Sequence, residues 1–147
     1  MLHNNISNRV AGTVAFRVDN CLLKYKKNEG FLTKTLNVLR GKKWSADIDP
    51  EMLNRVNYVY KRTDYLVALV VSEEYEKGLE EFLMKNNIPY SELLVDKFNY
   101  FHHLDINLKL NSGDYIYYVD SDKHRLNALD NKNGITPEIF DIIFRGR

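Results

Sequence analysis

Three apolar segments of strand length lie along the chain, and each is followed by a polar residue. They cover residues 12–18, 64–71 and 114–119, and the polar residues that follow are Asp19, Ser72 and Asp120. Segments rich in Val, Ile and Tyr that do not alternate strictly with polar residues are typical of strands buried on both faces of a sheet. A shorter segment of the same kind, 92–95, is followed by Asp96 and predicts a fourth strand.

Helical patterns separate these segments. Asp49 followed by Pro50 predicts a helix that continues to Arg62, because an acidic N-cap and a proline at the first position favour a helix start. Ser72, followed by two glutamates in what would be the first helical turn, predicts the start of a second helix, which ends near residues 86–87. A third, short helix is predicted after Asp122. The apolar spacing of residues 137–145 predicts an amphipathic helix that either closes the core, the commoner use, or docks a second subunit.

Two segments fit this alternation less well. Residues 24–46 form a basic excursion between the first strand and the first helix, with a helix-like stretch at 31–39. The lysines of this excursion are Lys24, Lys26, Lys27, Lys34, Lys42 and Lys43. Residues 98–111 fit either an irregular strand or a loop that returns to the sheet.

Alternating strands and helices predict one α/β domain over residues 1–147, with a small open parallel sheet flanked by helices. Right-handed crossovers bring the carboxyl ends of such strands to one edge, where ligands bind in open α/β sheets. We therefore expect Asp19, Ser72 and Asp120 to lie in one crevice.

Composition narrows the class of protein. The 147 residues carry 21 basic and 20 acidic side chains, for a net charge of +1, with 44% hydrophobic residues. These values exclude a wholly disordered chain and give no bulk charge for binding nucleic acid or a membrane surface. No apolar segment approaches the roughly 20 residues of a membrane span, and residues 1–8 lack a signal-peptide core. We expect a cytoplasmic protein that binds neither membranes nor nucleic acid.

The strand ends also carry a resemblance. The segment Phe16-Arg17-Val18-Asp19-Asn20-Cys21-Leu22-Leu23, the strand that ends at Ser72 and the segment Val119-Asp120-Ser121-Asp122 come in the order and spacing of three family motifs. The chain resembles the haloacid dehalogenase-like superfamily over about residues 14–135. Most members are magnesium-dependent phosphatases, so the resemblance implies a Rossmann-like fold, here nearly without a cap domain.

The departures from the family pattern concern the residues that do the chemistry. Arg17 stands where the family has its nucleophilic aspartate, and a guanidinium cannot attack phosphorus. Asp19 matches the general acid/base, and Asp120, with Asp122 beside it, matches a magnesium ligand. The family lysine has no clear match, with Lys97 and Lys109 as candidates. In an alternative register Asp19 is the nucleophile and Cys21 takes the acid/base position.

We hypothesise that Arg17 pairs with Asp19 or Asp120, repels magnesium, and so replaces metal and nucleophile together. The protein is then catalytically degenerate, needs no cofactor, and acts by binding a phosphate-bearing ligand or a protein partner. The residues expected to bind that ligand are Arg17, Asp19, Ser72, Lys97, Asp120 and Asp122.

Two other functions stay open. One is an active magnesium-dependent phosphatase or nucleotidase, with Asp19 as catalytic residue and with Asp19 and Asp120 as metal ligands. The other is a viral or bacterial regulatory module that binds a protein.

Structural roles compete with each functional interpretation. A strand-end aspartate is often a helix cap or a solubilising charge, and Ser72 is more often an N-cap than a ligand. Cys21 has no histidine that the sequence places beside it, which favours a small buried thiol over a nucleophile. His102 and His103 are adjacent, so on a strand they point to opposite faces and do not share a metal ion.

Overall fold

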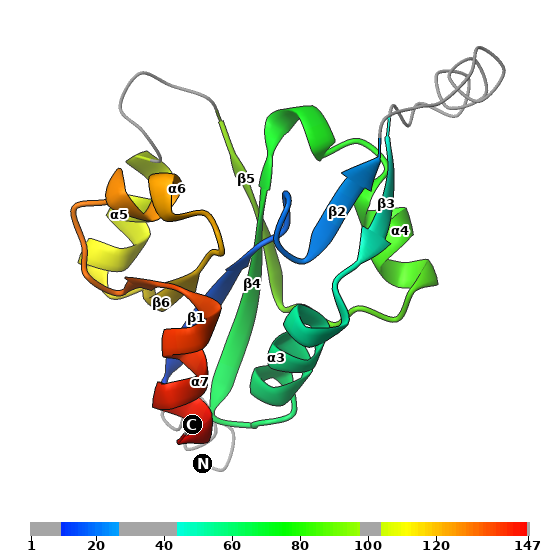
Figure 1. Ribbon diagram of the computed structural model, residues 1–147. Coiled ribbons are helices and arrows are strands. Elements are labelled where there is room, and N and C mark those ends of the chain that lie inside the picture. Colours follow the sequence, from blue (N-terminus) through cyan, green and yellow to red (C-terminus); the bar gives the residue numbers. More distant parts are fainter. Residues whose placement is uncertain (1–9, 27–43, 98–103, 147) are drawn as a thin grey trace, which may run out of the picture.

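A five-stranded parallel sheet forms the centre of the computed structural model, which describes residues 10–26, 44–97 and 104–146 (Figure 1). Its strands, in spatial order, are β5 (Glu92–Asp96), β4 (Tyr65–Ser72), β1 (Gly12–Arg17), β6 (Tyr115–Val119) and β7 (Gly134–Ile135). Counted along the chain, this order is 3-2-1-4-5, that of a doubly wound sheet. The predicted α/β class with an open parallel sheet is confirmed. The order reverses between β1 and β6, where ligands bind in such sheets.

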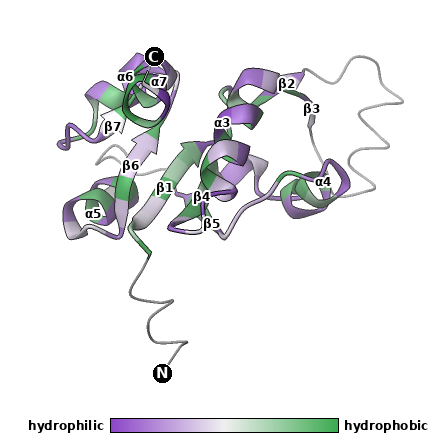
Figure 2. Cartoon of the chain, turned by 90° about the horizontal axis from the view of Figure 1, so that it is seen from below, coloured by the Kyte–Doolittle hydropathy of each residue, from purple (hydrophilic) through white to green (hydrophobic). Residues whose placement is uncertain are grey.

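The central strands are apolar because both of their faces are covered. In β4 the five residues 67–71 are completely buried, and in β1 residues 14–16 are. Figure 2 shows the hydrophobic colouring of β1 between the surrounding helices. All four predicted strands are present. The sequence did not reveal β7, because two residues beside β6 are too short to leave a pattern.

Helices cover both faces of the sheet. The helices α3 (Pro50–Tyr60), α4 (Leu79–Lys85) and α7 (Pro137–Arg145) share one core cluster with the sheet residues Val14, Phe16, Val67 and Leu69. The opposite face carries α5 (Leu104–Ser112), whose Ile106 and Leu110 pack on Ala15, Ala68 and Val70. The short α6 (Lys123–Asn127) follows β6 at the carboxyl edge. No helix in these described ranges is long and apolar enough to cross a membrane.

Three predicted helix starts are confirmed with their physical cause. The Asp49 side chain accepts a hydrogen bond from the Met52 N–H (3.0 Å) and begins α3, whose buried Met52, Val56 and Val59 have helical spacing. The Asp122 side chain caps α6. The tail predicted from residue 137 is α7, which begins after Thr136.

Two expectations were wrong. Ser72 does not cap a helix: a single 3₁₀ turn, η1 (Glu73–Tyr75), follows it, and α4 starts later, after Gly78, whose φ of 84° suits a glycine. The ambiguous segment up to residue 111 is neither strand nor loop where it is described. It forms α5 because the buried Ile106 and Leu110, four residues apart, face the sheet.

The described parts of the basic excursion form a two-stranded antiparallel sheet. Its strands β2 (Leu23–Lys26) and β3 (Ser45–Ile48) pair in antiparallel fashion and stand at the carboxyl edge of the sheet (Figure 1). The Tyr25 ring stacks on Tyr75 with centroids 3.7 Å apart and meets Trp44 edge-on at 5.2 Å. These contacts fix the two-stranded sheet beside the ends of β1 and β4. The helix-like stretch 31–39 lies outside the described residues.

Candidate functional site

Arg17 is the centre of a buried network at the carboxyl ends of β1, β4 and β5. Its Nη2 donates to Asp19 Oδ2 and to Ser72 Oγ, each at 2.7 Å, and its Nη1 donates to Asp96 Oδ2 at 2.9 Å. The residue is only 2% exposed. Strand register explains the reach: Arg17 lies beside Val70, Ser72 lies beside Asp96, and these side chains project from the same face of the sheet. The guanidinium therefore spans β4 and ties three strand ends together.

Asp19 is held on both of its oxygens. The Ser72 N–H donates to Oδ1 at 3.0 Å and to Oδ2 at 3.2 Å, and the Ser72 hydroxyl also donates to Oδ2. Asn20 follows with a φ of 53°, a left-handed conformation that asparagine tolerates and that turns the chain towards β2. Because Ser72 binds Asp19 and accepts from Arg17, its hydroxyl is engaged here and not at a helix start.

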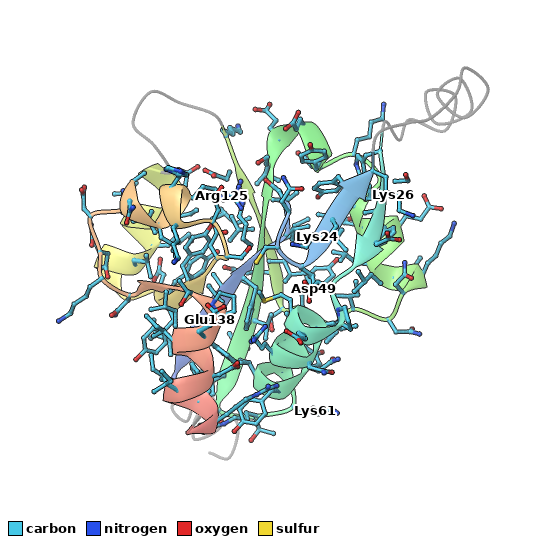
Figure 3. The ribbon with its side chains drawn as sticks, in the orientation of Figure 1. Lys24, Lys26, Asp49, Lys61, Arg125 and Glu138 are labelled. Carbon is cyan, nitrogen blue, oxygen red and sulfur yellow. The ribbon has the colours of Figure 1, made fainter. Side chains whose placement is uncertain are left out.

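A second arginine holds Asp120. The Arg125 guanidinium donates through Nε (2.7 Å) and Nη2 (2.9 Å) to the two carboxylate oxygens, which is bidentate pairing. The Tyr118 hydroxyl (2.6 Å) and the Asp122 N–H (2.9 Å) also donate to Asp120, which is completely buried. Arg125 Nη2 reaches the Asp19 carbonyl oxygen at 3.1 Å, so this side chain bridges β1 and β6 where the strand order reverses (Figure 3).

The expected pairing of Arg17 is confirmed for Asp19 and wrong for Asp120. Arg17 gives one nitrogen to Asp19 and another to Asp96, and the bidentate pair with Asp120 is made by Arg125. Asp120 ends β6, which lies next to β1, but its oxygens already accept from Arg125, from Tyr118 and from the Asp122 N–H. Two arginines therefore neutralise the carboxylates that the sequence analysis assigned to Arg17 alone.

Electrostatics keep the cations of the site charged. Burial lowers the pKa of Arg17, but the neighbouring Tyr118 and Asp19 and the hydrogen bonds to Asp96 and Asp19 raise it further, so its pKa lies above the ordinary arginine value. Burial, and then the charge of Asp120, hold the pKa of the Tyr118 phenol well above its usual range. Tyr118 therefore acts as a neutral donor to Asp120. The site combines two permanent cations with the carboxylates of Asp19, Asp96 and Asp120.

No family model matches this chain, and no curated protein or solved structure matches it either. The interpretation of the site therefore depends on its own geometry. Among the described residues, no group of three or more His, Cys, Asp or Glu side chains is arranged to hold a metal ion.

Not all of the predicted ligand-binding residues come together. Arg17, Asp19 and Ser72 share one network, and Asp120 joins Asp122 through Arg125, whose Nη1 lies 3.3 Å from Asp122 Oδ2. The two candidate lysines stay apart from both groups. Within the described part of the chain, the exposed Lys97 has no hydrogen bond or ion pair with them. Lys109 lies 3.8 Å from Asp114, at the amino edge of β6 and so at the opposite end of the sheet.

Three residues of the site were missed from the sequence. Asp96 also ends a strand, so the rule that selected Asp19 and Asp120 selects it too. Arg125 stands one helical turn after Asp122, and this spacing returns its side chain to the helix start. Tyr118 offered no signal among ten tyrosines.

Cys21 is the buried thiol that the sequence favoured. It is completely buried, and burial, with a smaller contribution from Asp120, raises its pKa to about 11 although Ser121 hydrogen bonds to it. A thiol with this pKa is protonated at neutral pH and is a poor nucleophile. The pair His102 and His103 lies outside the described residues.

Proposed function

We propose that this chain is a catalytically degenerate haloacid dehalogenase-like protein that acts by binding a protein partner. One observation carries the proposal: a buried guanidinium, Arg17, stands at the nucleophile position of the resemblance and is neutralised by Asp19 and Asp96. The parallel sheet of order 3-2-1-4-5, with Asp19, Ser72 and Asp120 at the ends of adjacent strands, supports the same resemblance.

The chemistry of a phosphatase does not fit these side chains. Arg17 offers no lone pair to phosphorus. Asp19, at the acid/base position, already accepts from Arg17 and from Ser72 on both oxygens. A carboxylate held in this way on both oxygens is poorly placed to move a proton to or from a substrate.

Magnesium does not fit the site either. The two oxygens of Asp120 accept from Arg125, Tyr118 and the Asp122 N–H. A divalent cation would have to displace these donors and lie beside two permanent positive charges, of which Arg17 is buried. The guanidiniums neutralise the carboxylates that a metal neutralises in active family members.

A phosphate-bearing ligand is disfavoured because most hydrogen-bond donors of the two guanidiniums are already engaged. The Nη atoms of Arg17 and the Nε and Nη2 atoms of Arg125 already donate to carboxylates, so that Arg17 Nε, which has no partner among the described residues, is left for a ligand. An incoming anion would also meet three buried carboxylates. The surface offers a better candidate for binding. Helix α7 exposes Ile139, Ile142 and Ile143, and clustered exposed apolar side chains mark protein-binding surfaces.

A phosphatase assay tests the proposal against its main rival. Wild-type protein with magnesium and a chromogenic phosphate ester or a nucleoside monophosphate is expected to release no phosphate above the buffer rate. Asp19→Asn is the matched control, with circular dichroism to check its fold. Turnover that persists through purification and disappears in Asp19→Asn would show an active enzyme. A saturable rise of the melting temperature with inorganic phosphate would assign a phosphate ligand in place of the protein partner.

A further inference from the structure

Helix α7 is amphipathic, and its two faces have different environments. On the inner face Phe140 is completely buried and meets Phe16 edge-on at 5.6 Å, and Phe144 stacks on Phe140 at 4.6 Å. On the outer face Ile139, Ile142 and Ile143 are 44%, 60% and 45% exposed. Three isoleucines at i, i+3 and i+4 form one continuous stripe along the helix. We call this surface the isoleucine stripe.

The stripe is presented on a rigid support. Arg55 of α3 makes a bidentate pair with Asp141 (2.9 and 2.8 Å), and the Tyr58 hydroxyl donates to the Phe144 carbonyl oxygen at 2.9 Å. These contacts, with the buried Phe140 and the partly buried Phe144, fix α7 against the domain. A partner therefore meets a preformed helix and orders little of it on binding, which reduces the entropic cost of association.

The charges beside the stripe are self-complementary. Glu138 lies in the first turn of α7, Arg145 in the last, and both lie on the side of α7 that faces α3. Arg145 stands over the Tyr58 ring of α3 at 5.2 Å and lies 3.8 Å from Asp141 of its own helix, and Glu138, seven residues before Arg145, lies on the same side of α7. When a second α7 packs antiparallel on the first, Glu138 of each copy lies opposite Arg145 of the other.

The shape of the surface agrees with the same arrangement. On the other side of α7, towards α6, a groove of about 490 Å³ lies beside Ile139. Its lining combines the apolar Leu126, Leu129 and Ile135 with polar side chains that include Lys123, Asp130 and Lys132. The groove is at the amino end of α7, whereas Ile142 and Ile143 project from the carboxyl half. Antiparallel packing brings the projecting isoleucines of one copy over the groove of the other, so that one patch serves both copies.

We propose that the protein forms a two-fold symmetric homodimer through antiparallel packing of α7, with the isoleucine stripe at its centre. The inference rests on the proposed function in one respect, that the partner is a protein, and it names that partner as a second copy of this chain. A contact of one helix and one groove is small, so micromolar affinity is expected. The Arg17 site is not part of this surface.

Sedimentation velocity across low to high micromolar concentrations tests the dimer. The wild type is expected to shift from the 17.3 kDa monomer to twice that mass. Ile142→Lys is expected to raise the dimer dissociation constant about 100-fold, because each dimer loses two buried isoleucines. Met84→Lys is the matched control: Met84 is 73% exposed on α4, and its substitution is expected to leave the dimer intact.

Charge exchange tests the antiparallel arrangement separately. Glu138→Arg and Arg145→Glu are each expected to weaken the dimer, and the double variant is expected to restore it, because the pair is re-formed with reversed sign. A wild type that stays monomeric overturns the inference, as does a dimer that Ile142→Lys leaves unchanged. A heterologous protein bound at the stripe by a monomer also overturns it. None of these results affects the phosphatase assay. The two experiments therefore distinguish a wrong dimer proposal from a wrong proposal that the Arg17 site is catalytically inactive.

Discussion

Replacing Arg17 with alanine is expected to lower the free energy of unfolding by about 3–5 kcal/mol. Asp19 and Asp96 are 3% and 6% exposed and share the guanidinium, so its removal leaves two buried carboxylates without their common cation. Breaking a buried ion pair from one side is far more costly than the net contribution of the pair itself, because the remaining charge stays desolvated. Urea denaturation followed by circular dichroism measures the change.

Two companion variants make the result specific to the buried network. Arg17→Lys keeps the charge, but an ammonium cannot reproduce the planar fork that reaches Asp19, Ser72 and Asp96, so we expect an intermediate loss. Arg62→Ala is the control, because Arg62 pairs with Asp64 at the surface and both side chains are 40% exposed. Its loss is expected to be far smaller than that of Arg17→Ala, because solvent-exposed ion pairs contribute little to stability. A comparable loss for Arg17→Ala would mean that the network does not stabilise the fold.

Replacing Arg125 with alanine is expected to cost about 3 kcal/mol. Asp120 is completely buried and would keep only the Tyr118 hydroxyl and the Asp122 N–H as donors. The Arg125 side chain is 18% exposed, so water can enter after truncation, and we expect the loss to fall below that of Arg17→Ala. The same denaturation experiment measures it, with Lys26→Ala in its exposed pair with Asp47 as the control.

The two arginines are also expected to be coupled. Burial lowers the pKa of Arg125, but the hydrogen bond and the charge of Asp120 raise it above its ordinary value, and the nearby positive charge of Arg17 opposes that rise. The two guanidiniums therefore repel each other. Each single variant relieves that repulsion, so the effects of the two substitutions are not expected to be additive. Additive effects would show that the two networks at the strand ends act independently.

The fold was largely predictable because its central strands, β1 and β4, are mostly buried. The segments around β1, β4 and β6 are continuously apolar, and such segments leave a pattern whatever their neighbours are. Helix α5 left a weaker apolar pattern in the sequence, because Leu108 is exposed between the buried Ile106 and Leu110. Ser72 misled for another reason: its hydroxyl had a stronger bond available, to Asp19, than the N–H groups of a following helix.

The sequence predicted site residues only where they stand at the ends of predicted strands. The rule that carboxyl ends of parallel strands meet brought Asp19 and Ser72 together correctly. It could not say which carboxylate Arg17 contacts, because that depends on strand order. Asp96 lies on β5, two strands from β1, and Asp120 lies on the other side. Arg125, the bidentate partner of Asp120, could not be identified either, because its direction depends on where α6 begins.

Magnesium binding by the wild-type protein tests the central claim most directly. The claim is that Arg17 and Arg125 occupy the carboxylates that would otherwise hold a metal. Thermal unfolding is followed in millimolar magnesium chloride, against sodium chloride of equal ionic strength. The account predicts the same melting temperature in both salts. A saturable rise with magnesium that is lost in Asp19→Asn would contradict it, because ligand binding raises the melting temperature only where the folded protein has a site.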